Sequence, residues 1–167
     1  MGRPADRAEL EAAAVDEIRG WQTDQDIFDE LVAELAGRTR TEMRVIDIVQ
    51  RLGPITAGQL AAEVRLTSGA VTAVVDRLEA VGYVRRLRDT VDRRRVLIEV
   101  TPKVLEASEP VFRQIAEEGF GQMAAYTDEE LATIFRFIRE GREFLHRHTA
   151  RVQAMIAERD RKAANPG

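Results

Sequence analysis

The sequence predicts a mainly α-helical protein that contains a winged helix-turn-helix with a two-stranded β wing, flanked by N- and C-terminal dimerisation helices. Three observations predict this fold class. Two short helical segments, each with its own capping residue, are separated by only Arg65 and Leu66. Two arginine-rich segments of β-branched and aliphatic residues follow them directly. Long segments with apolar residues at helical spacing occupy both ends of the chain.

Composition and cysteine content limit the classes of protein to which this chain can belong. At 167 residues, 44% hydrophobic and 32% charged, the chain has the composition of a soluble globular protein with its own core. No apolar stretch approaches the roughly 18–20 residues that span a bilayer, and the N-terminus lacks the apolar region of a signal peptide. The absence of cysteine excludes disulfides, thiolate metal sites and a thiol-based redox switch. We therefore expect a cytoplasmic protein that makes no membrane contact.

Charge is distributed unevenly along the chain. The net charge is −4, but the segment from Arg65 to Arg95 contains eight arginines and four acidic residues, so it carries +4 and the remainder carries −8. A basic patch on an otherwise acidic protein is typical of a surface that binds a particular anion, such as nucleic acid.

The first two helical segments are predicted from apolar periodicity and end signals. Residues 6–37 carry an apolar stripe and predict one long helix or two. Thr39 and Glu42 have the spacing of a capping box at the start of the next helix, and Gly53-Pro54 ends it.

Two shorter helices follow, and their caps are clear. Thr56 with Gln59 begins the first, whereas Thr67 begins the second and Gly82 ends it. A two-residue connection forces a tight corner between them. In the second helix apolar residues recur at i, i+3, i+4 and i+7, which predicts one buried face made of Val71, Val74, Val75 and Leu78.

The rest of the chain predicts a hairpin and further helices. Residues 83–89 and 94–100 flank Thr90-Val91-Asp92 as two strands. Thr101-Pro102 begins a helix that runs to about residue 126, and Thr127 to Glu130 is the capping box of a last helix that ends near residue 159. We divide the chain into an N-terminal helical dimerisation segment (1–38), a winged helix-turn-helix lobe (39–101), C-terminal dimerisation helices (102–160) and a disordered tail (161–167), with further disorder expected at residues 1–5.

The outward face of the second corner helix is suited to a DNA groove. With its apolar residues turned inward, the residues that face outward are small or polar: Ser68, Gly69, Thr72, Ala73 and Asp76. Small side chains let the backbone approach base edges, and the hydroxyls can exchange hydrogen bonds with bases. Arg77, one turn further, can reach a phosphate or a guanine. The alternative is an ordinary solvated helix surface.

The hairpin turn carries the densest positive charge. Asp92 and Arg94 are two residues apart on a strand-like segment, so their side chains can share one side and the carboxylate can brace the guanidinium. A braced arginine loses less entropy on entering a narrow groove. We expect Arg94 to probe a groove and Arg93 and Arg95 to contact phosphates. A solvated charge run is the alternative for any one of them.

Residues 56–101 resemble the DNA-binding core of the MarR family (multiple antibiotic resistance regulators). The resemblance rests on LAAEVRLTSGAVTAVVDRLEAVGYVRR for the helix pair and first strand, and on DTVDRRRVLIEVT for the wing and second strand. It implies that the terminal helices dimerise and that the helix matching Thr67–Val81 reads the major groove. The wing matching Asp89–Arg95 then contacts the minor groove or backbone through an Asp-x-Arg element at Asp92 and Arg94. Family wings often carry a proline before this aspartate, where this chain has Thr90-Val91.

The flanking helices point to a partner. Residues 6–37 and 127–160 present apolar stripes that a small winged-helix domain cannot cover alone. Burying them across a two-fold axis gives a homodimer whose recognition helices lie about one DNA turn apart, which favours a near-palindromic operator. A long intramolecular bundle is the alternative.

These observations predict a sequence-specific transcriptional regulator that binds double-stranded DNA as a homodimer, and the resemblance implies that it is a ligand-responsive repressor. The resemblance implies effectors that are often phenolic or other small aromatic acids, held between the dimerisation helices and the DNA-binding lobe. Trp21, Phe28 and Met43 are candidates to line such a cleft, with plain core or dimer interface as their alternative role. A winged-helix module that binds protein instead of DNA is the alternative function.

Enzyme activity is not expected. His146 and His148 are the only histidines, and two residues apart on a helix they face different directions. With no cysteine and no acidic cluster beside them, they predict no metal site. No glycine-rich phosphate loop is present, so we expect no cofactor either.

Overall fold

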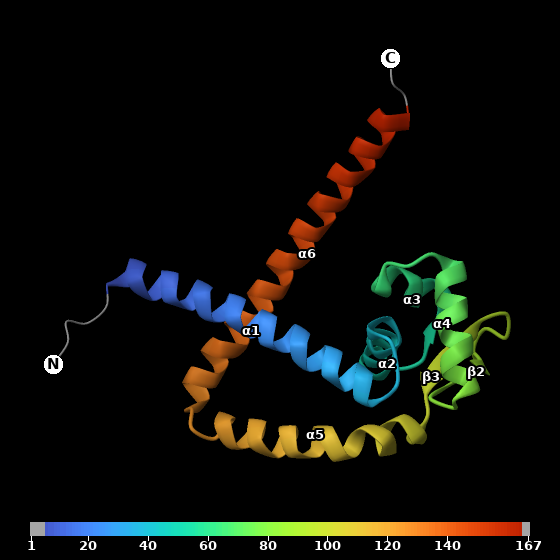
Figure 1. The fold of residues 1–167 in the computed structure, drawn as a ribbon, viewed down its shortest axis with the longest axis horizontal. Helices are drawn as coiled ribbons and strands as arrows, with labels where there is room; N and C mark the ends of the chain where they lie inside the picture. Colours follow the sequence, from blue (N-terminus) through green and yellow to red (C-terminus); the bar gives the residue numbers. More distant parts are fainter. Residues whose placement is uncertain (1–5, 165–167) are drawn as a thin grey trace. The chain divides into compact units, whose positions relative to one another are not determined.

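Six helices and three short strands form residues 6–164, the part of the chain that the computed structural model describes (Figure 1). The chain divides into two compact units, Met1–Pro110 and Val111–Gly167. The first unit contains α1 (Arg7–Leu35), α2 (Arg40–Leu52), α3 (Ala57–Val64) and α4 (Ser68–Ala80), with strands β1 (Ile55–Thr56), β2 (Val84–Arg88) and β3 (Val96–Val100). Helix α5 (Pro102–Met123) continues from the first unit into the second, which also contains α6 (Asp128–Ala164).

The predicted helix caps are confirmed. The Thr39 hydroxyl accepts a hydrogen bond from the Glu42 N–H at 3.2 Å, and the Glu42 carboxylate accepts one from the Thr39 N–H at 2.9 Å. Thr56 with Gln59 and Thr127 with Glu130 form the same reciprocal pair. Each pair satisfies backbone N–H groups that a helix start leaves unpaired, so the helices begin where the spacing predicts.

The core of the first unit lies among α2, α3, α4 and the sheet. The predicted inward face of α4 is confirmed, since all four of its apolar residues are buried. They pack with buried residues of α2, α3, the strands and the start of α5: Val45, Ile46, Ile48, Val49, Ile55, Leu60, Val64, Val84, Ile98 and Val104. Burial of each large aliphatic side chain contributes roughly 1.5–3 kcal/mol. This core fixes which face of α4 remains at the surface.

The sheet has one strand more than the sequence predicts. Strands β2 and β3 form the expected antiparallel hairpin, with Val84 opposite Val100 and Arg88 opposite Val96. A third strand, β1, pairs antiparallel with the other edge of β3 and places Ile55 opposite Ile98, both of them buried. The two-stranded wing is therefore part of a three-stranded sheet of order β1-β3-β2.

The flanking helices are longer and more regular than expected. Helix α1 is a single helix over Arg7–Leu35, and α5 continues through Pro110. Helix α6 reaches Ala164, so the expectation of a disordered tail is wrong for residues 161–164, which continue the helix. The expectations for residues 1–5 and 165–167 lie outside the described residues.

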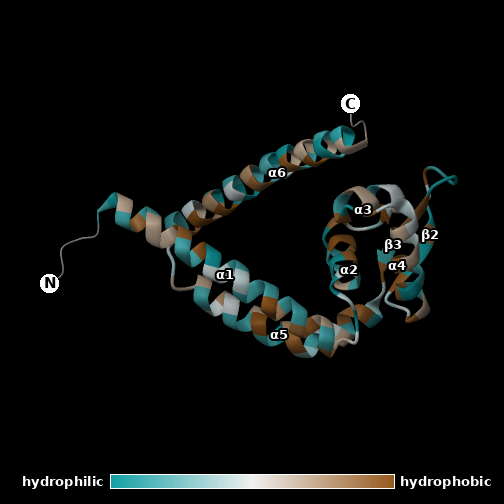
Figure 2. Cartoon of the chain, turned by 45° about the horizontal axis from the view of Figure 1, so that its top comes forward, coloured by the Kyte–Doolittle hydropathy of each residue, from teal (hydrophilic) through white to brown (hydrophobic). Residues whose placement is uncertain are grey.

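Large apolar side chains remain exposed along these helices. Hydrophobic and hydrophilic residues alternate along α1, α5 and α6, as expected of amphipathic helices (Figure 2). Helix α6 has no buried residue, although its apolar side chains recur at helical spacing. The exposed set on α6 comprises Ile134, Phe135, Phe137, Ile138, Phe144, Leu145, Val152, Met155 and Ile156. We call the part of it formed by Phe137, Phe144, Leu145 and Val152 the α6 stripe.

Candidate nucleic-acid interface

Helices α3 and α4 meet at a two-residue corner. Arg65 ends α3 in the left-handed region, with φ 57° and ψ 46°. Its N–H and the N–H of Leu66 both donate to the Ala61 carbonyl, the latter at 3.1 Å. The next residue, Thr67, accepts a hydrogen bond from the Ala70 N–H at 3.3 Å and so caps α4. The corner predicted from the sequence is thus built from a left-handed residue and a capping threonine.

The surface face of α4 is small and polar. All the residues expected to face outward are exposed: Ser68, Gly69, Thr72, Ala73 and Asp76. The Thr72 hydroxyl donates to the Ser68 carbonyl at 2.9 Å, which leaves its oxygen able to accept a hydrogen bond from a base. A Cβ placed on Gly69 would meet no protein atom within 4 Å, so this glycine is not required by packing in the protein itself.

Arg77 does not extend freely from α4. Its Nε donates to Glu42 Oε1 at 2.8 Å, and the two side chains join α4 to the first turn of α2. The Glu42 side chain is 5% exposed and that of Arg77 is 54% exposed. The sequence places Arg77 where it can reach a phosphate or a guanine, but the structure gives it a buried carboxylate partner 35 positions away in the chain.

The environment of Glu42 favours its charged form. Burial on its own raises the pKa of a carboxyl group, but the hydrogen bond from Arg77, the N–H of Thr39 and the positive charge of Arg77 outweigh it. The pKa of Glu42 is therefore lowered from its ordinary value of 4.5. A lowered pKa in the folded state stabilises the fold above the unfolded-state pKa, and this stabilisation is lost as the pH falls through the folded-state value.

We expect Glu42→Gln to lower the free energy of unfolding at pH 7 by about 1–2 kcal/mol, because a neutral amide replaces a charge-assisted partner of Arg77. The difference from the unsubstituted protein should begin to shrink as the pH falls below 4.5, the ordinary value at which Glu42 is protonated in the unfolded chain, and should shrink further until Glu42 is protonated in the folded protein as well. Urea unfolding between pH 3.5 and 7 measures both effects. Glu63→Gln, at an exposed position on α3, is the matched control and should change little. A constant difference at every pH would contradict the role given to the Glu42 charge.

Arg86 ties β2 to the second half of α4. Its guanidinium donates to Asp76 at 2.6 Å and also to Glu79, and its backbone N–H donates to Glu79 Oε1 at 3.1 Å. Burial lowers the pKa of the Arg86 guanidinium, but these carboxylates more than offset that effect and raise it. Asp76 and Glu79 share this single guanidinium, so each carboxylate has a cationic partner and the three side chains together carry a net charge of −1.

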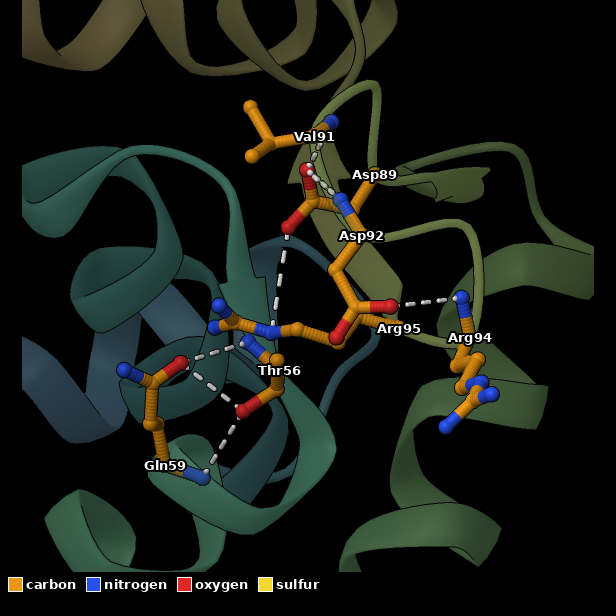
Figure 3. Close-up of polar contacts among 7 residues, drawn as sticks. All are labelled: Thr56, Gln59, Asp89, Val91, Asp92, Arg94 and Arg95. Carbon is orange, nitrogen blue, oxygen red and sulfur yellow. Dashed lines mark hydrogen bonds and ion pairs between the residues drawn. The ribbon is translucent and has the colours of Figure 1, made fainter.

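Asp89 organises the turn between β2 and β3 (Figure 3). One carboxylate oxygen accepts hydrogen bonds from the Val91 N–H at 2.8 Å and the Asp92 N–H at 3.4 Å, and the other lies 3.7 Å from Arg95 Nε. The hydrogen bond from Val91 is the largest cause that lowers the pKa of Asp89, and the Asp92 N–H and the charge of Arg95 add to it, against a partial loss of solvation. The Val91 side chain is 94% exposed at the tip of the turn.

The expected brace between Asp92 and the Arg94 guanidinium is not formed. The Asp92 carboxylate accepts instead from the backbone N–H of Arg94 at 3.1 Å, which shapes the tip as a tight turn (Figure 3). The guanidinium that a carboxylate does hold is that of Arg95, through Asp89. Asp92 and Asp89 both order the turn, and the predicted pair of Asp92 with the Arg94 guanidinium is wrong in both of its residues.

Half of the arginines in the basic segment are already paired. Within residues 6–164, Arg77, Arg85, Arg86 and Arg95 pair with carboxylates, Arg85 with Glu99 across the hairpin. The other four have exposed side chains without a hydrogen bond or ion pair in the described part of the chain: Arg65, Arg88, Arg93 and Arg94. Free positive charge is therefore concentrated at the corner before α4 and at the wing.

The candidate effector residues lie in different environments. The Trp21 side chain is 64% exposed on α1, and Phe28 is half-buried on the same helix. Met43 on α2 packs against the core of the first unit. For Met43 the structure therefore favours the alternative of an ordinary core residue.

Residues 6–164 contain neither a metal-binding cluster nor a helix able to cross a membrane. Across residues 6–164 no group of three or more His, Asp or Glu side chains is placed to hold a metal ion. None of the helices described here combines the length and apolarity needed to cross a membrane.

Comparisons with known proteins identify relatives of the chain. The family model described as "MarR family" matches residues 39–96. The uncharacterized HTH-type transcriptional regulator YcgE of Bacillus subtilis (strain 168) is 36% identical over 147 residues, which cover 88% of this chain and 96% of the relative.

Solved structures share the fold. FabT of Streptococcus pneumoniae, determined in complex with DNA, matches with a TM-score of 0.56 and 24% identity over 79% of this chain and 97% of FabT. NadR in complex with 4-hydroxyphenylacetate matches with a TM-score of 0.54 and 19% identity over 84% of this chain and 96% of NadR.

Proposed function

Because the chain belongs to the MarR family of transcriptional regulators, we propose that it is a homodimeric repressor that binds a near-palindromic operator and releases it when a small aromatic ligand binds. In this proposal α4 enters the major groove, the wing contacts the minor groove or the DNA backbone, and the terminal helices join two protomers. Its site residues are Thr67, Ser68, Gly69, Thr72 and Ala73 of the α4 segment and Arg93 and Arg94 of the wing, positioned by Arg77, Asp92 and Arg95.

The observation that carries the proposal is the exposed face of α4. A buried apolar face fixes the helix on the core, and the opposite face presents small side chains, hydroxyl groups and no unpaired carboxylate. Such a face allows close approach to base edges. The structure of the related fold in FabT was determined with DNA, which supports the same use of this fold here.

Dimerisation is supported by the exposed α6 stripe. A stripe of large apolar side chains without a buried residue is unusual at the surface of a monomeric protein. A second copy of the chain would cover the same stripe on both protomers across a two-fold axis, as homodimers usually do. Two α4 helices would then read two half-sites, which favours a near-palindromic operator.

An aromatic effector is supported by family membership and by NadR, whose structure contains 4-hydroxyphenylacetate. In this chain Trp21 and Phe28 on α1 remain candidate contacts, whereas Met43 packs in the core. A ligand that prefers the DNA-incompetent arrangement of the dimer would lower operator affinity by shifting the population toward it.

Footprinting on the DNA that flanks the gene tests this proposal. We expect protection of a near-palindromic segment whose half-sites are about one helical turn apart, and loss of protection on addition of an effector such as 4-hydroxyphenylacetate. Protection that no small aromatic acid relieves would contradict the ligand-responsive part. If no DNA segment is protected and the flanking helices α1, α5 and α6 bind other proteins instead, the result favours a winged-helix module that binds protein.

We expect Gly69→Ala to separate fold stability from DNA affinity. Because the added methyl group meets no protein atom, the variant should fold at least as stably, with a gain of roughly 0.5–1 kcal/mol from helix propensity. The same methyl group should weaken operator binding by about 1–3 kcal/mol if this part of α4 approaches the bases closely. Thermal unfolding and fluorescence anisotropy measure the two effects. Gly58→Ala on α3, where a Cβ also has open space, is the matched control; equal affinities for both variants would contradict close approach at Gly69.

A further inference from the structure

The C-terminal end of α4 is held by the residues that begin α5. The Lys103 Nζ donates a hydrogen bond to the Val81 carbonyl at 2.8 Å, and the Thr101 hydroxyl donates one to the Gly82 carbonyl at 2.6 Å. The Thr101 N–H also donates to the Tyr83 carbonyl, at 2.9 Å. We call the side chains of Thr101 and Lys103 the α5 clamp.

Helix α4 ends without help from the α5 clamp. The Gly82 N–H donates to the Glu79 carbonyl and the Tyr83 N–H donates to the Leu78 carbonyl, both at 2.9 Å, and Gly82 has φ 76°. These bonds form a Schellman motif, which is sufficient to end a helix. Water would satisfy the Val81 and Gly82 carbonyls equally well if the clamp were absent. What the clamp adds is an attachment of α4 to α5.

Packing and charge add to the hydrogen bonds of the α5 clamp. A Cβ placed on Gly82 would lie 3.6 Å from the Lys103 Cδ and 3.9 Å from its Nζ, so the lysine side chain lies against the backbone of this glycine. The C-terminus of a helix carries the negative end of the helix dipole, which favours the lysine ammonium group. Val104, the next residue, is buried in the same core as the apolar face of α4. The start of α5 is therefore fixed to the end of α4.

Helix α5 links this contact to the second unit of the chain. It is one helix from Pro102 to Met123, and the boundary between the two units falls within it, after Pro110. The α5 clamp thus ties α4 to the helix that leads to the α6 stripe, the proposed dimer contact. In such a dimer, the distance and rotation between the two α4 helices depend on how firmly each is attached to its α5.

We infer that Thr101 and Lys103 are positioning residues that fix α4 on α5 and thereby make the dimer selective for one spacing between its two half-sites. The inference rests on the proposed function, because it requires two α4 helices that read DNA together. Neither side chain has to touch DNA for this role. One added base pair moves a half-site by about 3.4 Å and turns it by about 35° on B-DNA, and only a loosened α4 would follow such a shift.

An operator with one base pair inserted between its half-sites tests the inference. We expect the unsubstituted protein to bind the inserted operator at least roughly tenfold more weakly than the operator found by footprinting. Thr101→Val/Lys103→Met keeps the size of both side chains and removes both of their hydrogen bonds. In this variant we expect the ratio of the two affinities to fall by about three- to tenfold. Fluorescence anisotropy measures the ratio.

Three further variants control for stability and charge. Thr101→Ser/Lys103→Arg retains both donors and should keep the ratio of the unsubstituted protein. Lys103→Met alone, at an exposed position, should lower the ratio in the same direction without endangering the fold. Its slope of log K against log salt should stay unchanged, because no phosphate contact is lost. Lys162→Met makes the same substitution at the other lysine of the chain and should change neither the ratio nor the slope.

The outcomes separate the inference from the proposed function. If the unsubstituted protein discriminates between the two spacings and both the double variant and Lys103→Met discriminate equally well, the positioning role is wrong and the proposed function stands. Loss of discrimination in Thr101→Ser/Lys103→Arg, or a smaller salt slope in Lys103→Met, would also contradict the inference. If the unsubstituted protein fails to prefer its operator to scrambled DNA, both the inference and the proposed function fall.

Discussion

Leu145→Asp is expected to convert the protein to monomers and to weaken operator binding by about 10²–10⁴-fold, the gain that linking two binding modules provides. Leu145 lies in the α6 stripe and is 53% exposed in the protomer, so an aspartate there leaves the protomer fold intact. In a dimer the same aspartate would be buried without a partner, which costs several kcal/mol. Analytical ultracentrifugation and fluorescence anisotropy on operator DNA measure the two effects.

The control for this change lies on the polar side of the same helix. Glu143→Gln alters a charge two residues from Leu145 without touching the α6 stripe, and it should leave both the oligomeric state and operator affinity unchanged. Circular dichroism of both variants checks that the helical content is kept. If Leu145→Asp remained dimeric, the α6 stripe would not be the dimer interface.

Replacing both free arginines at the wing tip is the second large change. Arg94→Ala is expected to weaken the free energy of operator binding by about 1–3 kcal/mol. The double variant Arg93→Ala/Arg94→Ala is expected to weaken it more than either single variant does. Both side chains lack a carboxylate partner within residues 6–164, so their removal leaves no buried charge behind. Loss of a phosphate contact lowers the affinity for all DNA sequences and makes the binding constant depend less steeply on salt concentration. Loss of a groove contact lowers the affinity mainly for the operator.

Arg85→Gln/Glu99→Gln is the matched control for the wing variants. It removes a cross-strand ion pair from the hairpin without changing the net charge, so operator affinity should stay within a few fold. An operator affinity of the double wing variant equal to that of this control would show that the wing does not contact DNA.

The sequence predicts those features of the site that depend on local spacing. The buried and exposed faces of α4 follow from the 3.6-residue period of Val71, Val74, Val75 and Leu78, and the structure confirms them. The caps at Thr39, Thr56 and Thr67 are confirmed for a similar reason, because a cap is a contact between residues three positions apart.

Features that depend on contacts distant in the sequence could not be predicted. Strand β1 has two residues, too few for any alternation, and it exists because β3 offers a free edge. The partner of Arg77 is 35 positions away on another helix. Neither periodicity nor composition indicates such a pairing.

In the wing, the sequence also fails to predict a contact between residues that are close in the chain. The spacing of Asp92 and Arg94 allows two side chains on one side of a strand, but the chain at that point is a turn, not a strand. In a turn, an aspartate more often accepts from a nearby backbone N–H, and both Asp89 and Asp92 do so. The alternation of side chains along a strand does not hold for residues 92–94, which lie between β2 and β3.

The pairing of arginines also changes how the basic segment is understood. Four of its arginines have no carboxylate partner. Of the other four, Arg77 bonds α4 to α2 and Arg86 bonds α4 to β2, whereas Arg85 and Arg95 form pairs within the hairpin. Arg77 and Arg86 thus position α4, since each bonds it to a different neighbour. Substitution of these two should change fold stability as well as affinity.

We propose above all that this chain reads a particular DNA sequence as a dimer. Fluorescence anisotropy at about 150 mM salt, with a duplex from the DNA beside its gene and a scrambled duplex of equal length, tests it most directly. We predict binding to the first at least about 10³-fold tighter than to the second, with two protomers per duplex. Equal affinity for the two duplexes, or a complex with one protomer, would contradict the account.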